Sequence, residues 1–321
     1  MTVPQRARRV VSHGIALGLI AGGAALGAGA VQAEPAAARI EVGVYQDDPL
    51  RGVPALRATA GPRTTRVIST YVTGGRTVDP AIIRLAARTG ARLLVSWMPD
   101  NGKDGAGQPK YRLSQIRRGR QNAGLIALTK QLRNLRPAPI LRPMPEPNTT
   151  WYAWSGTVNR NTPAAYVSAW KKVRSVVRKS GGKRVKLLWA PYARSVPDTP
   201  ANAIAAYFPG AGQVDLVGTS AYNFGTMGGL AWTDPDALFE DAYRQISALA
   251  PKPFWIAETG SSAKGGSREK WISQLSQLPT TIPGLAGLVW FDVRDRNGDF
   301  RLGTRRATRA AFSAFARRTG R

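Results

Sequence analysis

The feature that most constrains the fold is an alternation of short apolar runs with stretches of helical periodicity. Eight apolar, β-branched runs recur along the chain: Ile40–Tyr45, Arg66–Tyr71, Ala91–Trp97, Ala138–Met144, Val185–Ala190, Val214–Ser220, Pro253–Glu258 and Ala286–Asp292. Between most of them, apolar residues return every three or four positions, which places them on one face of a helix. These stretches are Pro80–Arg88, Asn122–Leu135, Pro163–Arg178, Pro235–Leu249, Ser267–Leu278 and Thr304–Ala316.

Continuous apolar strands that alternate with amphipathic helices indicate a parallel sheet covered by helices. Eight such units over roughly 285 residues fit a (β/α)8 TIM barrel, whose usual size is about 250 residues. A doubly wound open sheet is the alternative, but it normally carries a Gly-rich phosphate-binding turn after its first strand. The turn Tyr45–Pro49 is not of that kind. We therefore predict the α/β class and a single barrel over residues 34–321, with Pro99–Pro109 as a functional loop.

The first 33 residues are typical of a secretory signal peptide. Arg6, Arg8 and Arg9 precede the uncharged apolar run Ile15–Val31, and small residues follow at Val31 and Ala33. This order of basic, apolar and cleavage regions is that of a signal peptide. We expect removal of residues 1–33, a secreted protein, and no stable membrane insertion. An uncleaved anchor is the alternative.

The Cys and His counts exclude several kinds of catalytic site. The chain has no Cys, and its one His is His13, inside the predicted signal peptide. A mature chain without imidazole or thiol has no Ser-His-Asp triad, no Cys-His pair and no zinc-thiolate site. We predict no metal and no cofactor, and proton transfer by carboxylates, Tyr, Lys or water.

Two glutamates follow predicted strands at the end of the barrel where chemistry takes place. Glu146 comes directly after the fourth run, and Glu258 ends the seventh. Barrel enzymes build their sites at the carboxyl ends of the strands. Glycoside hydrolysis needs two such carboxylates, one to protonate the leaving oxygen and one to attack or to activate water. The alternatives are a surface acid for Glu146 and a structural ion pair with Arg142 for Glu258.

The residues around these glutamates resemble glycoside hydrolase family 26. The resemblance rests on RPMPEPNTTWYAW at 142–154, VDLVGTSAYN at 214–223, PFWIAETG at 253–260 and GLVWFD at 287–292. That family contains β-mannanases and some β-1,3-xylanases and mixed-linkage β-glucanases. The resemblance covers roughly Ile40 to Phe315 of this chain, and it implies the same (β/α)8 barrel.

The resemblance also implies roles for individual residues. Glu146 is expected to be the general acid/base and Glu258 the nucleophile of a retaining double displacement. The other site residues are expected to contact substrate or, for Tyr222, to hydrogen-bond the nucleophile. These are Trp97 at the rim, Arg142, Asn148, Trp151, Trp154, Tyr222, and Trp290 as the floor. Trp151, Tyr152 and Trp154 can form a stacking platform for pyranose rings, or else ordinary packing.

One position departs from the family pattern. The family typically has His immediately before the acid/base, and here that residue is Pro145. The replacement removes a ring that would contact substrate and orient the carboxylate. Pro143, Pro145 and Pro147 are expected to stiffen the loop instead, because each fixes its own φ.

The charge balance bears on partners. There are 46 Lys and Arg against 19 Asp and Glu, and loss of the signal peptide with its three Arg lowers the net charge from +27 to +24. So large a charge attracts polyanions, which for a secreted protein are anionic cell-wall polymers such as teichoic acids or uronate-bearing glycans. A solvated basic surface without a partner is the alternative. We predict a monomer that does not bind nucleic acid, because no nucleic-acid-binding motif accompanies the charge.

The sequence as a whole predicts a secreted retaining endo-β-glycosidase, β-mannanase-like, that acts on a β-linked polysaccharide. The alternative is a catalytically degenerate barrel that binds cell-surface or anionic polysaccharide. The two differ in geometry, because carboxyl groups of Glu146 and Glu258 far more than about 9.5 Å apart would fit neither glycosidase mechanism.

Overall fold

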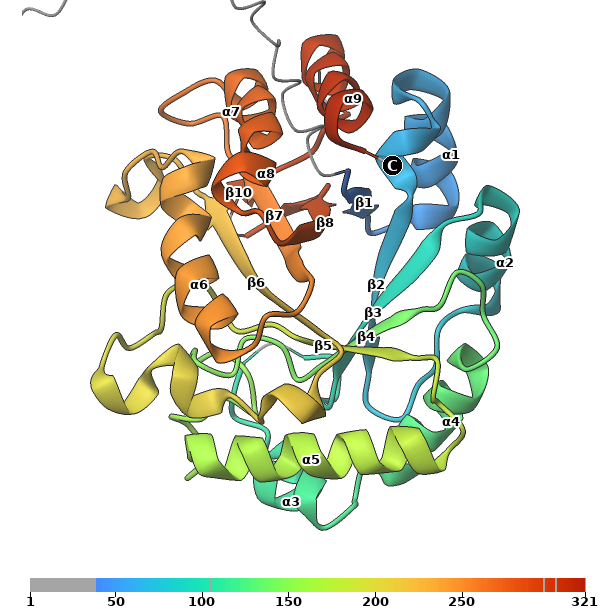
Figure 1. Ribbon diagram of the computed structural model, residues 1–321, viewed down its shortest axis with the longest axis vertical. Helices are drawn as coiled ribbons and strands as arrows, with labels where there is room; N and C mark the ends of the chain where they lie inside the picture. The colour runs from blue at the N-terminus through green and yellow to red at the C-terminus, as the bar shows by residue number, and fades with distance from the viewer. Residues whose placement is uncertain (1–38, 104, 297, 304, 321) are drawn as a thin grey trace, which may run out of the picture. The chain divides into compact units, whose positions relative to one another are not determined.

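Eight parallel strands close into a barrel, as the sequence predicts (Figure 1). The computed structural model describes residues 39–103, 105–296, 298–303 and 305–320, so the predicted signal peptide lies outside the described residues. The strands are β1 Glu41–Tyr45, β2 Val67–Thr73, β3 Arg92–Met98, β4 Ile140–Pro143, β5 Lys186–Trp189, β6 Leu216–Asn223, β7 Phe254–Ser261 and β8 Leu285–Phe291. Closure is made by β1, which pairs in parallel with β8 from Glu41↔Gly287 to Tyr45↔Phe291.

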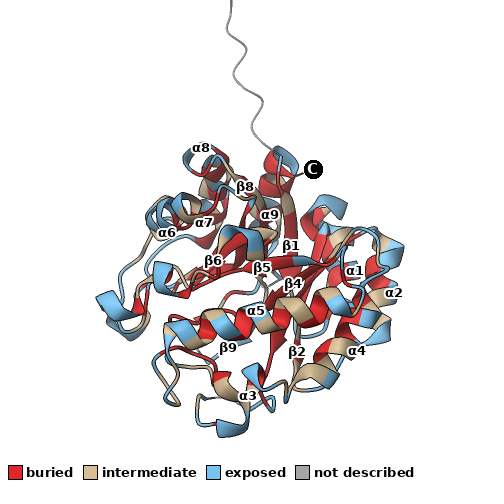
Figure 2. Ribbon diagram, turned by 60° about the horizontal axis from the view of Figure 1, so that its bottom comes forward, coloured by how far each residue is buried: buried red, intermediate tan, exposed pale blue. Residues whose placement is uncertain are grey.

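Helices surround the barrel with their apolar faces inward (Figure 2). They are α1 Pro49–Ala60, α2 Pro80–Thr89, α3 Leu113–Arg117, α4 Asn122–Leu132, α5 Pro163–Lys179, α6 Pro235–Leu249, α7 Arg268–Gln274, α8 Leu278–Thr281 and α9 Arg306–Thr319. A short hairpin of β9 Arg294–Asp295 and β10 Gly298–Asp299 follows β8. Within the described ranges, no helix has both the length and the apolar character needed to cross a membrane.

The helix signals in the sequence are confirmed in most places. Thr162 caps α5, since its hydroxyl accepts a hydrogen bond from the Ala165 N–H at 3.1 Å. At the start of α6 the side chain of Asp234 makes no capping hydrogen bond, and its carboxylate accepts a hydrogen bond from the Trp232 indole. Helix α1 was not predicted from the sequence, because its first two turns contain Arg51, Gly52 and Pro54 among the apolar residues. Such residues are poor helix formers or charged, and they obscure the apolar face.

The barrel interior is a packed core. A cluster from six strands fills it, namely Val67, Leu94, Ile140, Leu188, Ala190, Trp255, Ala257 and Val289. Trp255 has room for its indole because β8 carries Gly287, where an added Cβ would lie 2.3 Å from the ring. A second cluster lies between the strands and the helices. The interior is therefore closed below the strand ends, and any site must lie at the mouth.

We predict that Gly287→Ala lowers the free energy of unfolding by about 1–3 kcal/mol, because the new methyl group overlaps the Trp255 ring. Chemical denaturation measures the change. Gly212→Ala is the matched control, since nothing lies within 4 Å of a Cβ there, and a change of no more than about 0.5 kcal/mol is expected. Equal effects of the two substitutions would contradict this account of the core.

Candidate active site

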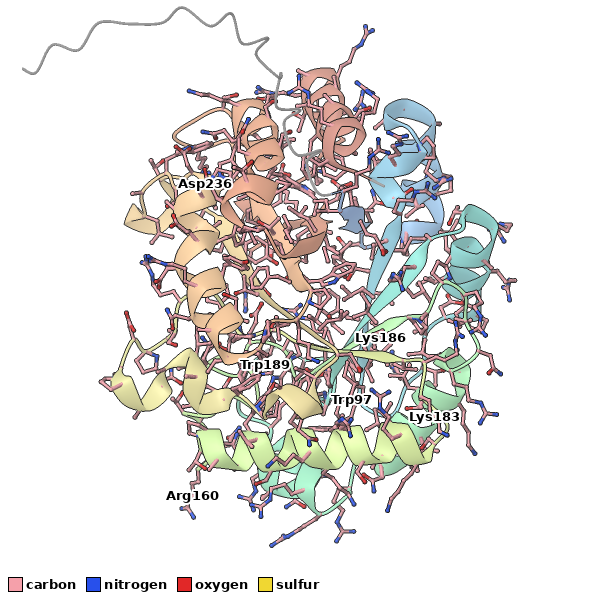
Figure 3. The ribbon with its side chains drawn as sticks, in the orientation of Figure 1. Trp97, Arg160, Lys183, Lys186, Trp189 and Asp236 are labelled. Atoms are coloured by element: carbon pink, nitrogen blue, oxygen red, sulfur yellow. The ribbon has the colours of Figure 1, made fainter. Side chains whose placement is uncertain are left out.

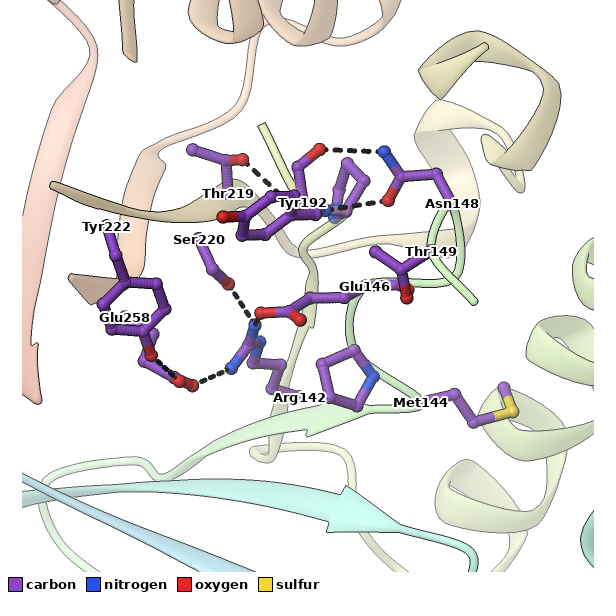
Figure 4. Close-up of polar contacts among 12 residues, drawn as sticks. Arg142, Met144, Glu146, Asn148, Thr149, Tyr192, Thr219, Ser220, Tyr222 and Glu258 are labelled. Atoms are coloured by element: carbon purple, nitrogen blue, oxygen red, sulfur yellow. Dashed lines mark hydrogen bonds and ion pairs between the residues drawn. The ribbon is translucent and has the colours of Figure 1, made fainter. Parts of the chain in front are cut away.

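Glu146 and Glu258 meet at the mouth of the barrel (Figure 4). Glu146 lies in the loop that follows β4, and Glu258 lies within β7. Both are buried, with relative exposures of 5% and 9%. Two carboxylates in so little water need compensating charge or hydrogen bonds.

Arg142 at the end of β4 compensates both carboxylates. Its Nη1 lies 2.8 Å from Glu258 Oε2, and its Nη2 lies 3.2 Å from Glu146 Oε1. The same Nη2 donates to the Ser220 hydroxyl on β6. The Arg142 side chain is 1% exposed. Burial lowers its pKa, but the negative charges of Glu258 and Glu146 outweigh burial and leave the pKa raised. One permanent cation therefore bridges the two acids inside the barrel.

Glu258 also accepts two tyrosine hydrogen bonds. Tyr71 from β2 donates to Oε2, and Tyr222 from β6 donates to Oε1. Burial, and then the negative charge of Glu258, raise the pKa of each phenol well above its usual value. Both hydroxyl groups therefore keep their protons at neutral pH and act as donors. With Arg142, three donors from three strands hold this carboxylate.

Glu146 has a different environment. Burial is the main reason that its pKa is raised, and the charge of Glu258 raises it further. Arg142, the Ser220 hydroxyl and the Trp151 indole, whose Nε1 lies 3.1 Å from Oε2, oppose that rise. Because its pKa is raised, Glu146 holds a proton more readily than an exposed glutamate does. Glu146 is thus a candidate proton donor, and it lies beside Glu258, whose carboxylate accepts three hydrogen bonds.

The loop that carries Glu146 has an unusual backbone. Met144 and Glu146 have φ values of 48° and 53°, in the left-handed region that non-glycine residues rarely occupy. Each precedes a proline, which disfavours the right-handed helical conformation for the residue before it. A following proline favours extended backbone instead, so the left-handed conformations of Met144 and Glu146 must be enforced by other contacts. Such conformations persist where surrounding contacts enforce them, often at functional sites.

Neighbouring loops hold this backbone in place. The Glu146 N–H donates to the Ala190 carbonyl at 3.0 Å. The Trp154 indole donates to the Pro145 carbonyl at 2.8 Å. Asn148 accepts a hydrogen bond from the Tyr192 N–H and donates to the Tyr192 carbonyl, at 2.8 and 2.9 Å. The loop after β4 is therefore fixed to the loop after β5.

A cavity of about 900 Å³ opens above the two carboxylates. Aromatic rings form two of its walls. Trp151 meets Tyr192 edge to face at 5.4 Å, and Tyr45 stacks on Phe291 at 5.1 Å. Residues of the predicted functional loop Pro99–Pro109, namely Asp100, Gly102, Lys103 and Gly105, also line it. Flat apolar rings with polar groups between them suit a sugar ring, which has apolar faces and a polar edge.

The structure corrects the predictions for Trp97 and Trp290. Both are fully buried, and neither lines the cavity. Trp290 packs outward against Trp271 and Phe312. Successive strand residues point to opposite faces, so the next residues, Met98 and Phe291, face the cavity instead.

Arg142, Asn148 and Trp154 are also corrected. Each is at most 1% exposed and none lines the cavity, so their predicted contact with substrate is replaced by internal roles. Arg142 binds the two carboxylates, and Asn148 joins two loops. Trp154 stacks behind Tyr152 at 4.6 Å, and Tyr152 lines the cavity. Of the remaining predicted residues, Glu146, Glu258, Trp151 and Tyr222 all lie at the cavity.

Three cavity residues, Tyr71, Tyr45 and Phe291, were not predicted from the sequence. All three lie in runs that were interpreted only as barrel strands, and all three line the cavity. The available signal was a tyrosine near the carboxyl end of a predicted barrel strand, because a fully buried Tyr hydroxyl needs a partner. As for metals, no group of three His, Cys, Asp or Glu side chains comes together in the part of the chain that the structure describes.

Comparison with known proteins identifies glycoside hydrolases as similar to this chain. The sequence model described as Glycosyl hydrolase family 26 matches residues 116–276. Endoglucanase H of Acetivibrio thermocellus is 26% identical over 228 residues, which are 70% of this chain and 24% of that protein. A mannan endo-1,4-beta-mannosidase of Bacillus subtilis strain 168 is 30% identical over 183 residues, covering 54% of this chain and 46% of that protein. The chain thus spans less than half the length of these relatives.

Solved structures share the fold. A β-mannanase from Bacteroides ovatus superposes with a TM-score of 0.64 at 20% identity, covering 87% of this chain and 88% of that one. The Bacillus subtilis mannanase BCman gives a TM-score of 0.60 at 18% identity, with 85% and 84% covered. At these identities the likeness establishes the (β/α)8 barrel, in agreement with the strand order described above.

We predict that Arg142→Gln lowers the free energy of unfolding by about 3–5 kcal/mol at pH 7, because it leaves two buried carboxylates without their cation. Arg142 lowers the pKa of Glu146, so this pKa rises further in the variant. The loss of stability should therefore shrink as the pH falls and Glu146 becomes neutral. Urea unfolding across a pH series measures it.

The matched control is Arg244→Gln, which breaks the exposed pair between Arg244 and Asp241. Exposed pairs contribute about 0–1 kcal/mol. A loss for Arg142→Gln no larger than that of the control, or one that does not depend on pH, would contradict the bridging role.

Proposed function

The chain belongs to glycosyl hydrolase family 26, and from that premise we propose that it is a retaining endo-β-glycosidase using Glu146 and Glu258. Membership makes it a glycoside hydrolase. The observation that carries the finer proposal is the bridge through Arg142, with Nη1 2.8 Å from Glu258 and Nη2 3.2 Å from Glu146. The bridged oxygens are separated by no more than two such contacts and the width of one guanidinium. That bound admits a glycosidase pair of either kind, about 5–5.5 Å apart in retaining enzymes and up to about 9.5 Å in inverting ones, and the choice of retention follows the family resemblance.

The two environments support different roles. Glu258, held by Arg142, Tyr71 and Tyr222, is the nucleophile in this proposal. Its carboxylate attacks the anomeric carbon while the bond to the leaving oxygen breaks. Glu146, whose raised pKa favours the protonated form, gives its proton to that oxygen. The products of this step are a covalent glycosyl-enzyme and the leaving part of the sugar chain, whose former glycosidic oxygen is now a hydroxyl group.

The second step returns the enzyme to its first state. Glu146, now a carboxylate, removes a proton from a water molecule while the oxygen of that water attacks the anomeric carbon. The bond to Glu258 breaks, and two inversions leave the original β configuration. Tyr222, which donates to Oε1 of Glu258 from β6, keeps that carboxylate in one orientation through both steps.

The substrate class follows from the cavity and the relatives. The relatives are named as an endoglucanase and as endo-1,4-β-mannosidases, so we propose a β-linked polysaccharide, with mannan as the first choice. The ion pair of Glu258 with Arg142 is present, but both acids also line one cavity and lie within reach of one guanidinium, and this closeness favours hydrolysis over a barrel that only binds. A panel of mannan, β-1,3-xylan and mixed-linkage glucan, followed by reducing-end release, tests the choice.

We predict that Glu146→Gln lowers kcat on the responsive glycan by about 10²–10⁴-fold, the usual contribution of general acid–base catalysis. Glu258→Gln should abolish turnover, because it removes the nucleophile. Each variant should keep the circular dichroism spectrum of the wild type. Glu240→Gln, an exposed position on α6, is the control and should keep full activity.

Product configuration tests the retaining mechanism separately. Proton NMR in the first minutes of reaction should show the β-anomer ahead of mutarotation. An α-anomer formed first would reject the covalent mechanism, whereas wild-type activity in both glutamine variants would reject the assignment of the two glutamates.

A third substitution tests the proton donor. Trp151→Phe keeps an aromatic ring on the cavity wall but removes the N–H that donates to Glu146 and lowers its pKa. The pKa of Glu146 should therefore rise. Because the proton donor must be protonated, the alkaline limb of the kcat/KM profile should move to higher pH. A limb that stays in place or moves to lower pH would contradict Glu146 as the donor.

A further inference from the structure

One long stretch of the chain carries positive charge almost alone. Between Gly105 and Pro197 there are nineteen Lys and Arg and a single acid, Glu146. That acid is buried in the cavity and bridged to Arg142, so it contributes nothing to the outer surface. An entire sector of the barrel surface therefore lacks acidic side chains of its own.

This stretch folds into adjacent elements. It contains α3, α4 and α5, and α5 packs against both of the others. Fourteen of its nineteen basic residues are exposed. Figure 3 places Arg160 near one end of α5 and Lys183 near the other. We call the exposed Lys and Arg of residues 105–197 the basic face.

Neighbouring segments bring few acids to the basic face, and exposed Asp79, next to Val78, which hydrogen-bonds Gln131 of α4, is one of them. Asp215 at the base of β6 pairs with Arg178 at 2.6 Å, and both are half-buried. Asp198 follows the stretch directly and is exposed. The charges along α3 and α5 thus reinforce each other over a screening length of about 8 Å at physiological salt.

The basic face continues from the cavity. Lys103 lines the cavity, and the loop after it reaches Ala106, whose carbonyl accepts a hydrogen bond from Asn159 at 2.6 Å. Arg160 is the next residue along the chain. Asn161 in turn accepts a hydrogen bond from the Leu113 N–H at the start of α3, at 3.2 Å. A polymer that leaves the cavity on this side therefore meets the basic face at once.

We propose that the basic face binds an anionic polysaccharide, one that carries carboxylates along its chain, beside the cavity. A surface of one sign attracts a polymer of the opposite sign, and binding releases the counterions of both. The choice of a polysaccharide rests on the proposed function, because the face continues from a glycan cavity. Binding itself requires no hydrolysis.

The surface chemistry favours a polysaccharide over a nucleic acid. Proteins that bind single-stranded nucleic acid combine basic residues with exposed aromatic rings on which bases stack. Among the described residues, the exposed large hydrophobic side chains are Leu50 and Leu230, and neither belongs to the basic face. What remains is repeated charge, which matches a polymer recognised by its repeated carboxylates.

The experiment removes four charges from the face. The variant combines Arg117→Gln, Arg118→Gln, Lys171→Gln and Lys179→Gln, all at exposed positions of α3 and α5 or their ends. Binding to immobilised polygalacturonate is measured by surface plasmon resonance over a salt series. Kd should rise at least about tenfold at low salt, and the dependence of log Kd on log salt should become shallower.

The matched control removes the same charge elsewhere. It combines Arg84→Gln, Arg88→Gln, Arg306→Gln and Arg318→Gln, which are exposed on α2 and α9. Its Kd should stay within about twofold of the wild type, whereas non-specific attraction would follow net charge alone. Equal losses in the two variants would overturn the assignment to this face.

Two further arms complete the test. Immobilised DNA and polyphosphate should retain the wild type less strongly than polygalacturonate at equal charge density, and the reverse order would overturn the choice of a polysaccharide. Hydrolysis of a short neutral oligosaccharide should be unchanged in the face variant. Loss of that activity with normal binding would overturn the separation of face from site. Lack of hydrolysis in every protein, with normal binding, would count against the proposed function and leave the face intact.

Discussion

The site depends on one buried cation. Arg142 comes from β4, and its guanidinium reaches Glu146 on the following loop, Ser220 on β6 and Glu258 on β7. Two nearly buried carboxylates would otherwise repel each other, and the hydration that burial removes would not be replaced. The Arg142 guanidinium offsets this repulsion and also fixes the positions of the two carboxylates, because its donors form a rigid planar fork. The bridge thus holds one oxygen of each acid from within the barrel, while loop contacts hold the backbone of Glu146.

Glu146 and Glu258 have the same side chain but different surroundings, which favour different chemical roles. Tyrosine hydroxyl groups from two strands donate to Glu258, while Glu146 relies on an indole and on a backbone fixed in an unusual conformation. Burial and the charge of Glu258 both favour a proton on Glu146. Position 145, where the family typically has His, is a proline whose carbonyl is held by Trp154. In this structure the Glu146 side chain is therefore oriented by its backbone, by Trp151 and by Arg142.

The sequence predicted the barrel, because eight apolar runs alternating with amphipathic helices leave few other arrangements. It also placed Glu146 and Glu258 at strand ends, where a barrel brings distant residues together. It did not predict which face a strand residue occupies. Strands buried on both sides have no alternation of polar and apolar residues, so nothing distinguished Trp97 from Met98, or Trp290 from Phe291. Tyr71 was missed for a related reason: its hydroxyl has a partner only once β2 and β7 share one barrel.

Salt screens the charges of the basic face and the charges of the site to different extents. The basic face lies in solvent, where salt screens each charge within about 8 Å, whereas Arg142 and its two acids are buried and screened far less. A change in salt should therefore act on how a charged polymer approaches the barrel and leave the ionic bridge nearly unaffected. Like charges packed on adjacent helices also oppose the compact state. The stretch from 105 to 197 has nineteen basic residues and one buried acid, so repulsion among its charges destabilises about a third of the barrel. A bound polyanion would reduce that repulsion.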